Sequence, residues 1–350
     1  MMRFGAGVTG RRPLRRGLLL GLPAAWGAVA ITYKLGCPLA QQTGLGARIV
    51  TSAVFFAVGT GLVLHVRQVL LTELKQVRRV AGAAQAALLR PLPPRVDGLA
   101  VAAAQRSAEQ GAFVGGDLYD VISTEHGVRV VMGDVRGHGL AAIGTVAAVL
   151  GSFREAVHDE RDLTGVLRRL DRALARHLRE KARVAQSLGD PDLAVAEEFV
   201  TVLLLEIRRD GDVRALNCGH PWPHLLRGGR VVPLSVTEPL PPLGLFPLPA
   251  DLVPLPGGSL LPGDSLFLHT DGVEDARDTH GRFFPLTAAL ADAVRDGPEP
   301  PRTVLGAVHA RLMRHSGGAP ADDIAMLVLR NERGATVPCP GRPVGHRAHH

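Results

Sequence analysis

The chain has 350 residues, enough for one large domain or two of ordinary size, and a formal net charge of +7. Its hydrophobic content of 46% and mean hydropathy of +0.14 are high for a purely soluble protein. Aromatic residues make up only 4% of the chain, too few for the stacking platforms that bind single-stranded nucleic acids, so the composition argues against nucleic-acid binding.

The cysteine content is low and gives no sign of a cysteine-based framework. Cys37, Cys218 and Cys339 are far apart, and such spacing forms neither a disulfide framework nor a zinc-binding pattern. This usage fits a reducing, cytosolic environment for the catalytic part of the chain.

Two apolar runs lie near the N-terminus, at residues 17–33 and 49–66. Each is close to the lower limit of about 17–20 residues for a membrane-spanning helix. We expect a two-helix transmembrane hairpin over residues 17–66. The alternatives are a cleaved signal peptide for the first run, a single spanning helix, and two buried helices of a soluble protein.

Basic residues flank this hairpin on both outer sides. Five arginines lie in the basic N-terminus, residues 1–16, and four basic residues follow the second run between positions 67 and 79. The loop between the runs holds only Lys34 and Arg48. Because basic flanks favour the cytoplasmic side, both ends are predicted to face the cytoplasm. The prediction is a multi-pass protein of the cell membrane whose catalytic domain is cytoplasmic.

Residues 67–90 contain apolar residues at helical spacing and no proline. A helix that ends before Pro91 is therefore expected, within a linker over residues 67–94 that closes on a proline-rich boundary. The pattern is equally suited to a plain amphipathic spacer and to a coiled coil that carries a signal or forms a homodimer.

Beyond this boundary, residues 95–331 contain strands and helices in separate blocks, which predicts an α+β domain without alternating βαβ units. A hairpin is expected around a turn sequence at residues 209–212. Residues 332–350, rich in Gly, Pro, Arg and His, are predicted to form a disordered tail. The expected strands are 99–105, 128–132, 199–207, 213–217, 266–270 and 324–330, and the expected helices are 140–158, 163–181, 286–295 and 303–315.

Aspartates recur at the ends of strand-like runs. Asp117 follows two glycines and precedes a hydrophobic run that ends in Asp134, and a later run leads into Asp271. Asp322 and Asp323 come directly before the last strand. If that strand runs antiparallel to the others, these carboxylates gather at one edge of a sheet. Clustered carboxylates repel one another and are costly to desolvate, so such a cluster usually needs a cation.

The residue types favour a hard divalent metal. No His or Cys accompanies the acids at ligand spacing, and oxygen-only sites suit Mg²⁺ or Mn²⁺ rather than Zn²⁺. Two such ions can clamp a phosphoryl group for in-line attack without a protein nucleophile. Any one of these aspartates alone would more often be a turn or cap residue. The candidate ligands are Asp117, Asp134, Asp271 and Asp322.

Six motifs, in this order, resemble those of bacterial PP2C-like (PPM-type) serine/threonine phosphatases, in the branch of SpoIIE, RsbU and RsbP. The resemblance spans about residues 80–330. The motifs are Phe113–Asp120 (FVGGDLYD), Gly133–Gly139 (GDVRGHG), Asn217–Pro221 (NCGHP), Pro242–Gly244 (PLG), Thr270–Ala276 (TDGVEDA) and Asp322–Ile324 (DDI).

The resemblance implies an αββα sandwich, with two antiparallel sheets between helices and a centre of two Mn²⁺ or Mg²⁺ ions. It implies that Asp134 bridges the two ions and that the backbone carbonyl of Val135 binds one of them. By the same resemblance, Asp117, Asp271 and Asp322 would complete the protein ligands, and Asp134 and Asp117 would be the catalytic residues.

Two positions leave details open. Asp323 stands where relatives often carry Asn or Asp, and Asp322 is the preferred ligand. Eukaryotic relatives have a histidine, the proposed general acid, where this chain has Arg136, and an arginine does not donate protons near neutral pH. Arg136 is either a solvated surface residue or a phosphate contact. Asn217 and His220 are expected to shape a turn near the site and not to act chemically.

The predicted function is that of a membrane-anchored, metal-dependent protein serine/threonine phosphatase that uses a metal-activated water. In the family resembled, the usual substrate is a phosphorylated STAS-domain anti-anti-sigma factor. The alternative is a catalytically weak PP2C-fold scaffold that binds partners at the membrane, and the full set of expected ligands argues against it. A metal phosphoesterase acting on small molecules or nucleic acid is a weaker third hypothesis.

Overall fold

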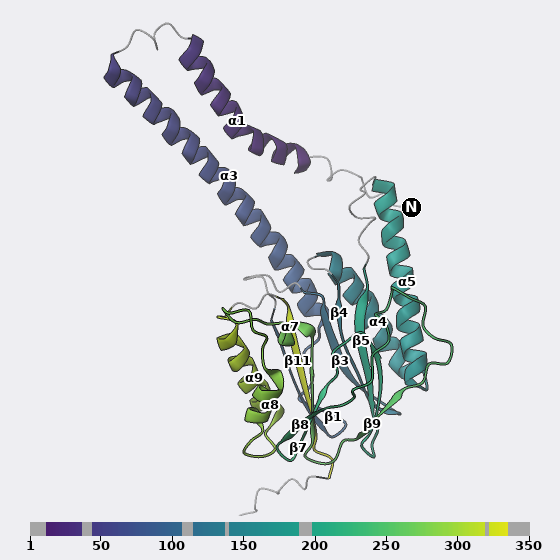
Figure 1. Ribbon diagram of the computed structural model, residues 1–350. Coiled ribbons are helices and arrows are strands. Elements are labelled where there is room, and N and C mark those ends of the chain that lie inside the picture. The colour runs from purple at the N-terminus through teal and green to yellow at the C-terminus, as the bar shows by residue number, and fades with distance from the viewer. Residues whose placement is uncertain are drawn as a thin grey trace, which may run out of the picture. The chain divides into compact units, whose positions relative to one another are not determined.

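The computed structural model describes residues 12–36, 44–106, 115–136, 140–188, 198–318 and 322–334 (Figure 1). The chain divides into two compact units that meet between Val77 and Arg78. The tail predicted to be disordered begins three residues too early, because residues 332–334 are placed in the structure and Arg333 donates to the Asp97 main-chain oxygen at 2.8 Å. The rest of the tail, from position 335 onward, lies outside the described residues, as does the N-terminus up to position 11.

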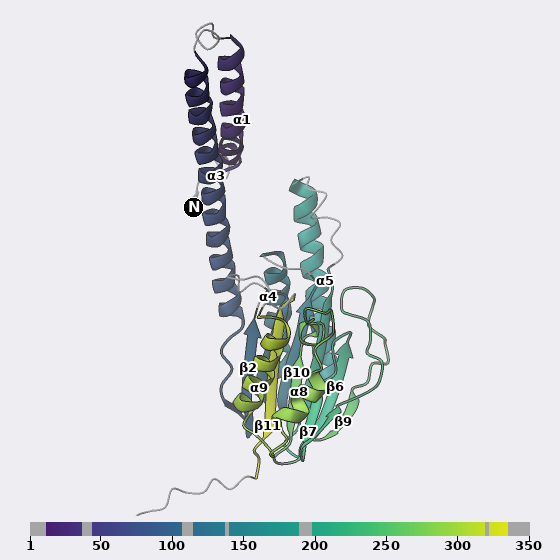
Figure 2. The same ribbon diagram turned by 60° about the vertical axis from the view of Figure 1, so that its left-hand side comes forward.

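The first unit contains α1 (Arg12–Gly36) and the first part of α3 (Leu45–Leu88), which lie side by side (Figure 2). The ring of Trp26 lies 5.4 Å from the ring of Phe55, and its indole N–H donates to the Phe55 main-chain oxygen at 3.3 Å. These contacts join the two predicted apolar runs in a pair of helices.

Within the described ranges, one helical stretch is long and apolar enough to cross a membrane, Ile49–Glu73, with a mean hydropathy of 2.0. It contains the second predicted run, 49–66. The first predicted run, 17–33, lies in α1, whose described residues do not meet the same criterion. The helix α3 continues through the predicted linker and ends at Leu88, before the proline-rich boundary as expected.

The second unit is built around two antiparallel sheets. One has the strand order β1-β2-β11-β10-β7-β8 and the other β3-β4-β5-β6-β9. The strands are β1 (Arg95–Val96), β2 (Leu99–Arg106), β3 (Asp117–Thr124), β4 (Gly127–Val135), β5 (Val200–Ile207), β6 (Asp212–Cys218), β7 (His224–Arg227), β8 (Arg230–Pro233), β9 (Leu255–Ser259), β10 (Ser265–His269) and β11 (Ile324–Asn331).

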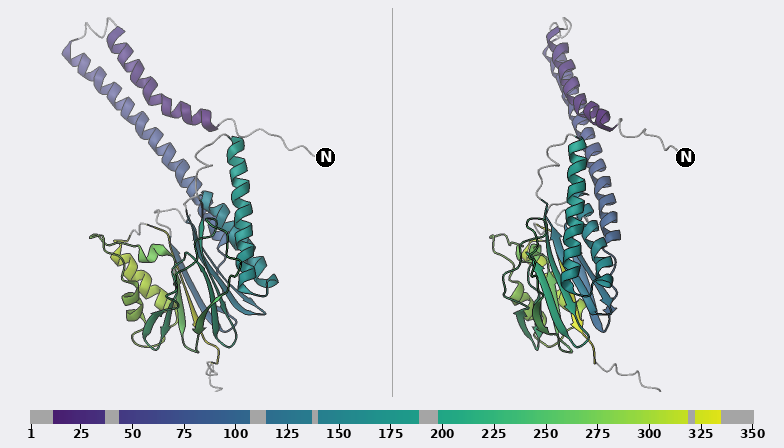
Figure 3. Two further views of the ribbon diagram at one scale, coloured as in Figure 1. Left: turned by 45° about the vertical axis from the view of Figure 1, so that its right-hand side comes forward. Right: turned by 90° about the vertical axis from the view of Figure 1, so that its right-hand side faces the viewer.

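Helices cover the outer faces of both sheets (Figures 1 and 3). The five-stranded sheet packs against α4 (Leu140–Asp159) and α5 (Leu163–Leu188). The six-stranded sheet packs against α8 (Leu286–Ala293) and α9 (Pro301–His315). The short helix α7 (Asp271–Glu274) begins where β10 ends. The second unit is therefore α+β, as the sequence pattern predicted, with the αββα layering that the family resemblance implied.

Apolar cores fill all three spaces between these layers. Met132 of β4 lies in the core between the two sheets, whereas its neighbour Val131 lies in the core under α4 and α5. Phe267 of β10 packs under α8 and α9. Successive side chains of a strand face opposite sides, so strands buried on both faces have continuous apolar runs instead of alternating ones.

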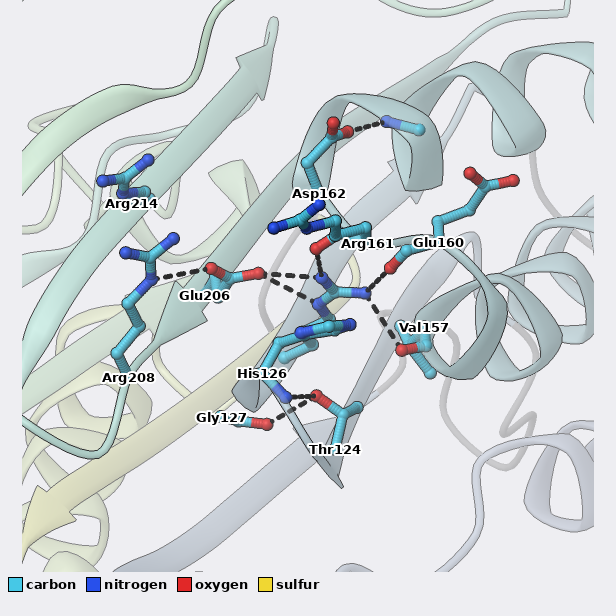
Figure 4. Close-up of polar contacts among 12 residues, drawn as sticks. Thr124, His126, Gly127, Val157, Glu160, Arg161, Asp162, Glu206, Arg208 and Arg214 are labelled. Atoms are coloured by element: carbon cyan, nitrogen blue, oxygen red, sulfur yellow. Dashed lines mark hydrogen bonds and ion pairs between the residues drawn. The ribbon is translucent and has the colours of Figure 1, made fainter.

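A buried arginine joins the end of α4 to the five-stranded sheet. Figure 4 labels its partners Val157, Glu160, Arg161 and Glu206. Arg129 of β4 is fully buried and donates to the carboxylate of Glu206 at 2.9 and 3.1 Å. It also donates to the main-chain oxygens of Val157, Glu160 and Arg161, at 2.6 to 3.0 Å. Carbonyls at a helix C-terminus lack partners within the helix, and one side chain satisfies them here.

Candidate metal centre

Asp117 and Asp134 face each other in the five-stranded sheet. Asp117 opens β3, Asp134 lies near the end of β4, and the two are direct partners in the antiparallel register. The N–H of Val135 donates to the main-chain oxygen of Gly116 at 3.1 Å. Like charges directly opposite each other destabilise a sheet. Another interaction must therefore offset the repulsion between the two carboxylates.

The six-stranded sheet brings the other aspartates to the same group. β10 ends just before Asp271, and β11 begins just after Asp322 and Asp323. The two strands are antiparallel, and the N–H of Thr270 donates to the main-chain oxygen of Ala325 at 3.1 Å. The last strand is therefore antiparallel to β10, but the expectation that the carboxylates gather at one edge of a single sheet is wrong. Asp117 and Asp134 belong to the five-stranded sheet, whereas Asp271 and Asp322 flank strands of the six-stranded sheet.

The aspartates act on one another electrostatically. Burial raises the pKa of Asp117 well above its ordinary value, and the charges of Asp134, Asp323 and Asp271 raise it further. Burial likewise raises the pKa of Asp134 to about 8, with added effects of Asp271, Asp322 and Asp323. Burial and the charge of Asp322 raise the pKa of Asp271. The five carboxyl groups therefore form one electrostatically coupled group, contributed by both sheets, whose full ionisation is costly without a cation.

Several oxygen atoms of this group suit a hard cation. The Oδ2 atom of Asp117 is buried and has no hydrogen-bond partner among the described residues. A Cβ on Gly116 would collide with the main-chain oxygen of Val135 and with Oδ1 of Asp134, so both oxygens lie beside this glycine. A buried carboxylate oxygen without a donor is costly, and a divalent cation would satisfy it.

Glycines also make room for Asp323. A Cβ on Gly115 would collide with the carboxylate of Asp323, and a Cβ on Gly272 would collide with its main-chain oxygen. The absence of side chains at Gly115 and Gly272 therefore lets Asp323 approach closely. Asp322 is exposed and Asp323 is half-buried. The structure brings both acids to the centre, and the choice between them stays a prediction.

As they stand, no three His, Cys, Asp or Glu side chains in the described part of the chain are close enough together to hold a metal ion. The strand register pairs Asp117 with Asp134, and electrostatic interactions link these two to Asp271, Asp322 and Asp323. The donors are all carboxylate or carbonyl oxygens, which fit Mg²⁺ or Mn²⁺ in chemical kind.

Neighbouring residues frame this centre. Arg136 is exposed just beyond β4, and its guanidinium carbon lies 5.0 Å from the centroid of the Phe199 ring. Asn217 closes the expected turn, since its side chain donates to the main-chain oxygen of His220 and accepts from the His220 N–H, both at 2.8 Å. Burial lowers the pKa of His220 to about 3 and that of His269 to about 4, so both imidazoles are neutral at pH 7.

Sequence reasoning missed Thr201, whose hydroxyl contacts the main chain of Asp134. Thr201 lies in the run VTVLLLEI, where threonine is a common strand residue and carries no motif. The register of β5 against β4 would have been needed to find it.

Residues 124–332 match the family described as Stage II sporulation protein E (SpoIIE), and the match covers more than half of the chain. The chain belongs to the SpoIIE family. The region matched by the SpoIIE family includes Asp134, Asp271 and Asp322, and it begins a few residues after Asp117.

Solved structures support the same fold for this SpoIIE-family chain. The SiaA-PP2C domain of Pseudomonas aeruginosa is 20% identical, with a TM-score of 0.56, over 74% of this chain and 98% of that one. The PP2C phosphatase domain of SpoIIE from Bacillus subtilis, with a regulatory fragment, is 16% identical, with a TM-score of 0.51, over 66% and 62%. The RsbU and RsbW domains of Rv1364c from Mycobacterium tuberculosis are 20% identical, with a TM-score of 0.50, over 67% and 61%.

Proposed function

We propose that the chain is a metal-dependent protein serine/threonine phosphatase. The observation that carries this proposal is the convergence of Asp117, Asp134, Asp271 and Asp322 from both sheets, with a buried, unpartnered oxygen on Asp117 among the described residues. These aspartates and the Val135 carbonyl would hold two Mn²⁺ or Mg²⁺ ions, with Asp134 between them. When bound, the ions would activate the attacking water and neutralise the charge of the transferring phosphoryl group.

The side chains of this protein would position the ions and the phosphate and would supply charges that bind them. The antiparallel pairing of β3 with β4 fixes the main-chain positions of Asp117 and Asp134, and so the places from which their carboxylates extend. Arg136 stands at the end of β4, and its planar guanidinium suits a phosphate oxygen. We propose it as a phosphate contact that does not donate a proton to the leaving group.

The test of this activity compares phosphate esters of different kinds. Purified full-length protein with Mn²⁺ is expected to release phosphate from phosphoserine and phosphothreonine peptides and to leave a phosphodiester intact. A scaffold without catalysis would release phosphate from neither. Hydrolysis of the phosphodiester at a comparable rate would favour a general metal phosphoesterase over a protein phosphatase.

For the substrate, we propose a phosphorylated STAS-domain anti-anti-sigma factor in the cytoplasm. Membership in the SpoIIE family supports this class of partner. Phosphoproteomes of cells with and without the gene should differ by increased serine or threonine phosphorylation of a STAS-domain protein in the deletion strain. An unchanged phosphorylation state of every STAS-domain protein would contradict the proposed substrate.

For the location, we propose a two-helix membrane hairpin over residues 17–66, with both ends in the cytoplasm. It is followed by a linker over 67–94, which would also form any homodimer, and a phosphatase domain over 95–331. The apolar stretch Ile49–Glu73 and the packing of Trp26 on Phe55 support this arrangement.

Reporter fusions test this topology. Green fluorescent protein fused after His350 should fluoresce, and bacterial alkaline phosphatase at the same junction should be inactive, because it needs export. Alkaline phosphatase inserted between the two helices, within residues 37–43, serves as the matched control and should be active. Active alkaline phosphatase at the C-terminal junction would contradict both the topology and a cytoplasmic substrate.

A further inference from the structure

A threonine hydroxyl holds the main chain of Asp134. Thr201 of β5 lies directly opposite Asp134 in the strand register. Its Oγ1 atom accepts a hydrogen bond from the Asp134 N–H at 3.2 Å and lies 3.4 Å from the Asp134 main-chain oxygen. The hydroxyl therefore contacts both main-chain polar groups of the residue that is proposed to bridge two ions.

A histidine stands behind this hydroxyl. The Nδ1 atom of His220 lies 3.0 Å from Thr201 Oγ1. His220 is 3% exposed, and both of its main-chain polar groups are bonded to the Asn217 side chain. Gly219 has a φ of +71°, and a Cβ there would lie 2.7 Å from Pro242. The turn and its packing therefore fix the main chain of His220, and burial restricts the space open to its ring.

Asp134 has a particular need for such support. It lies at the second-last position of β4, where the strand is about to leave the sheet. The carboxylate of Asp117 lies directly across the ladder and repels it. A hydroxyl bonded to the main chain of Asp134 resists displacement of the strand end by this repulsion.

We infer that Thr201 and His220 are positioning residues for Asp134. The turn Asn217–Pro221 holds the His220 ring, the ring orients the Thr201 hydroxyl, and the hydroxyl fixes the main chain that carries the Asp134 carboxylate and the Val135 carbonyl. This inference rests on the proposed function, because it concerns the same metal centre. It gives the NCGHP motif and Thr201 a shared role that does not involve contact with the phosphate.

The test replaces the Thr201 hydroxyl by a methyl group and keeps the branched shape of the side chain. Mn²⁺ binding by purified full-length protein is measured by titration calorimetry for the wild type and for Thr201→Val. Loss of a group that orients a metal ligand typically weakens metal binding by about 10- to 100-fold, and we expect that range. Thr201→Ser should retain near wild-type Mn²⁺ affinity. At saturating Mn²⁺, the KM for a phosphoserine peptide should be unchanged.

Thr124→Val is the matched control. The Thr124 hydroxyl likewise bonds to the main chain: it donates to the main-chain oxygen of Gly127 at 2.9 Å, at the opposite end of the β3–β4 hairpin. Thr124 is buried and Thr201 is half-buried. Its loss should lower the melting temperature in the same way as loss of the Thr201 hydroxyl and should leave Mn²⁺ affinity unchanged. This comparison separates positioning of the centre from general stability.

A double-mutant cycle tests the proposed connection. Because His220 acts through Thr201, His220→Phe should weaken Mn²⁺ binding in the wild type and have little further effect in Thr201→Val. Wild-type Mn²⁺ affinity in a folded Thr201→Val variant, or full additivity of the two changes, would overturn the inference and leave the proposed function intact. Failure of the wild type itself to bind Mn²⁺ would overturn the metal centre and this inference together.

Discussion

Asp134→Asn is expected to lower the rate of phosphoserine hydrolysis by at least about 10³-fold, or about 4 kcal/mol at 1.36 kcal/mol per tenfold change. Asp134 is the proposed bridge between two ions, so its loss removes the charge that holds both of them. The measurement is the initial rate against Mn²⁺ concentration, with circular dichroism to confirm folding. A folded variant that keeps most of its activity would contradict the two-ion proposal.

The pH dependence of stability provides a second check on this variant. Burial and neighbouring charges raise the pKa of Asp134 to about 8, from about 3.9 in an unfolded chain. The folded state then binds more protons than the unfolded state between these values, so stability falls as the pH rises from about 4 to about 8. In EDTA at pH 8, the melting temperature of Asp134→Asn should be equal to or higher than that of the wild type. Any such difference in melting temperature should become smaller toward pH 5.

The same assay separates the two acids before the last strand. Asp322→Asn should resemble Asp134→Asn, because Asp322 is the proposed ligand. Asp323→Asn should be much milder, since family relatives often carry asparagine there. An inactive Asp323→Asn beside a nearly normal Asp322→Asn would shift the ligand assignment by one residue.

Arg129→Met should destabilise the second unit by about 3–5 kcal/mol, the usual result of removing one partner of a buried ion pair. The change leaves Glu206, which is buried, without its main partner and leaves the carbonyls at the end of α4 unsatisfied. Denaturant unfolding followed by circular dichroism measures the loss.

Arg208→Met is the matched control for that prediction. Arg208 also donates to Glu206, at 3.1 Å, but its side chain is 41% exposed, so its loss should change stability by about 1 kcal/mol or less. The double change Arg129→Met with Glu206→Leu should recover part of the stability, because no unpaired charge remains buried. A loss below about 1 kcal/mol for Arg129→Met alone would contradict the structural role of this network.

Most of the long elements of the second unit were predictable because their apolar runs are strong and local, but β3 (Asp117–Thr124) was not among the expected strands. The last strand, predicted at 324–330, extends over Ile324–Asn331, and the helix predicted at 140–158 extends over Leu140–Asp159. The strand β9 was missed because its sequence, LPGGS, has no strand character, and only pairing with β6 makes it a strand. The strands β7 and β8 have four residues each, too short for a periodic signal.

The roles of side chains that depend on tertiary contacts could not be predicted from the sequence. The aspartates could be found because each lies in a short motif at the end of an apolar run. Arg129, in the run GVRVVM, is buried only because the end of α4 lies over it. Thr201 meets Asp134 only through the register of β5 against β4. In both cases the partners are distant in sequence.

The most direct test of the proposed centre is phosphoserine hydrolysis by the full-length protein before and after removal of divalent metal. If divalent ions hold this group of carboxylates, activity should be abolished by exhaustive treatment with EDTA. It should return in a saturable manner when Mn²⁺ or Mg²⁺ is added back. An unchanged rate after exhaustive chelation would contradict the assignment of Asp117, Asp134, Asp271 and Asp322 as the ligands of a catalytic metal centre.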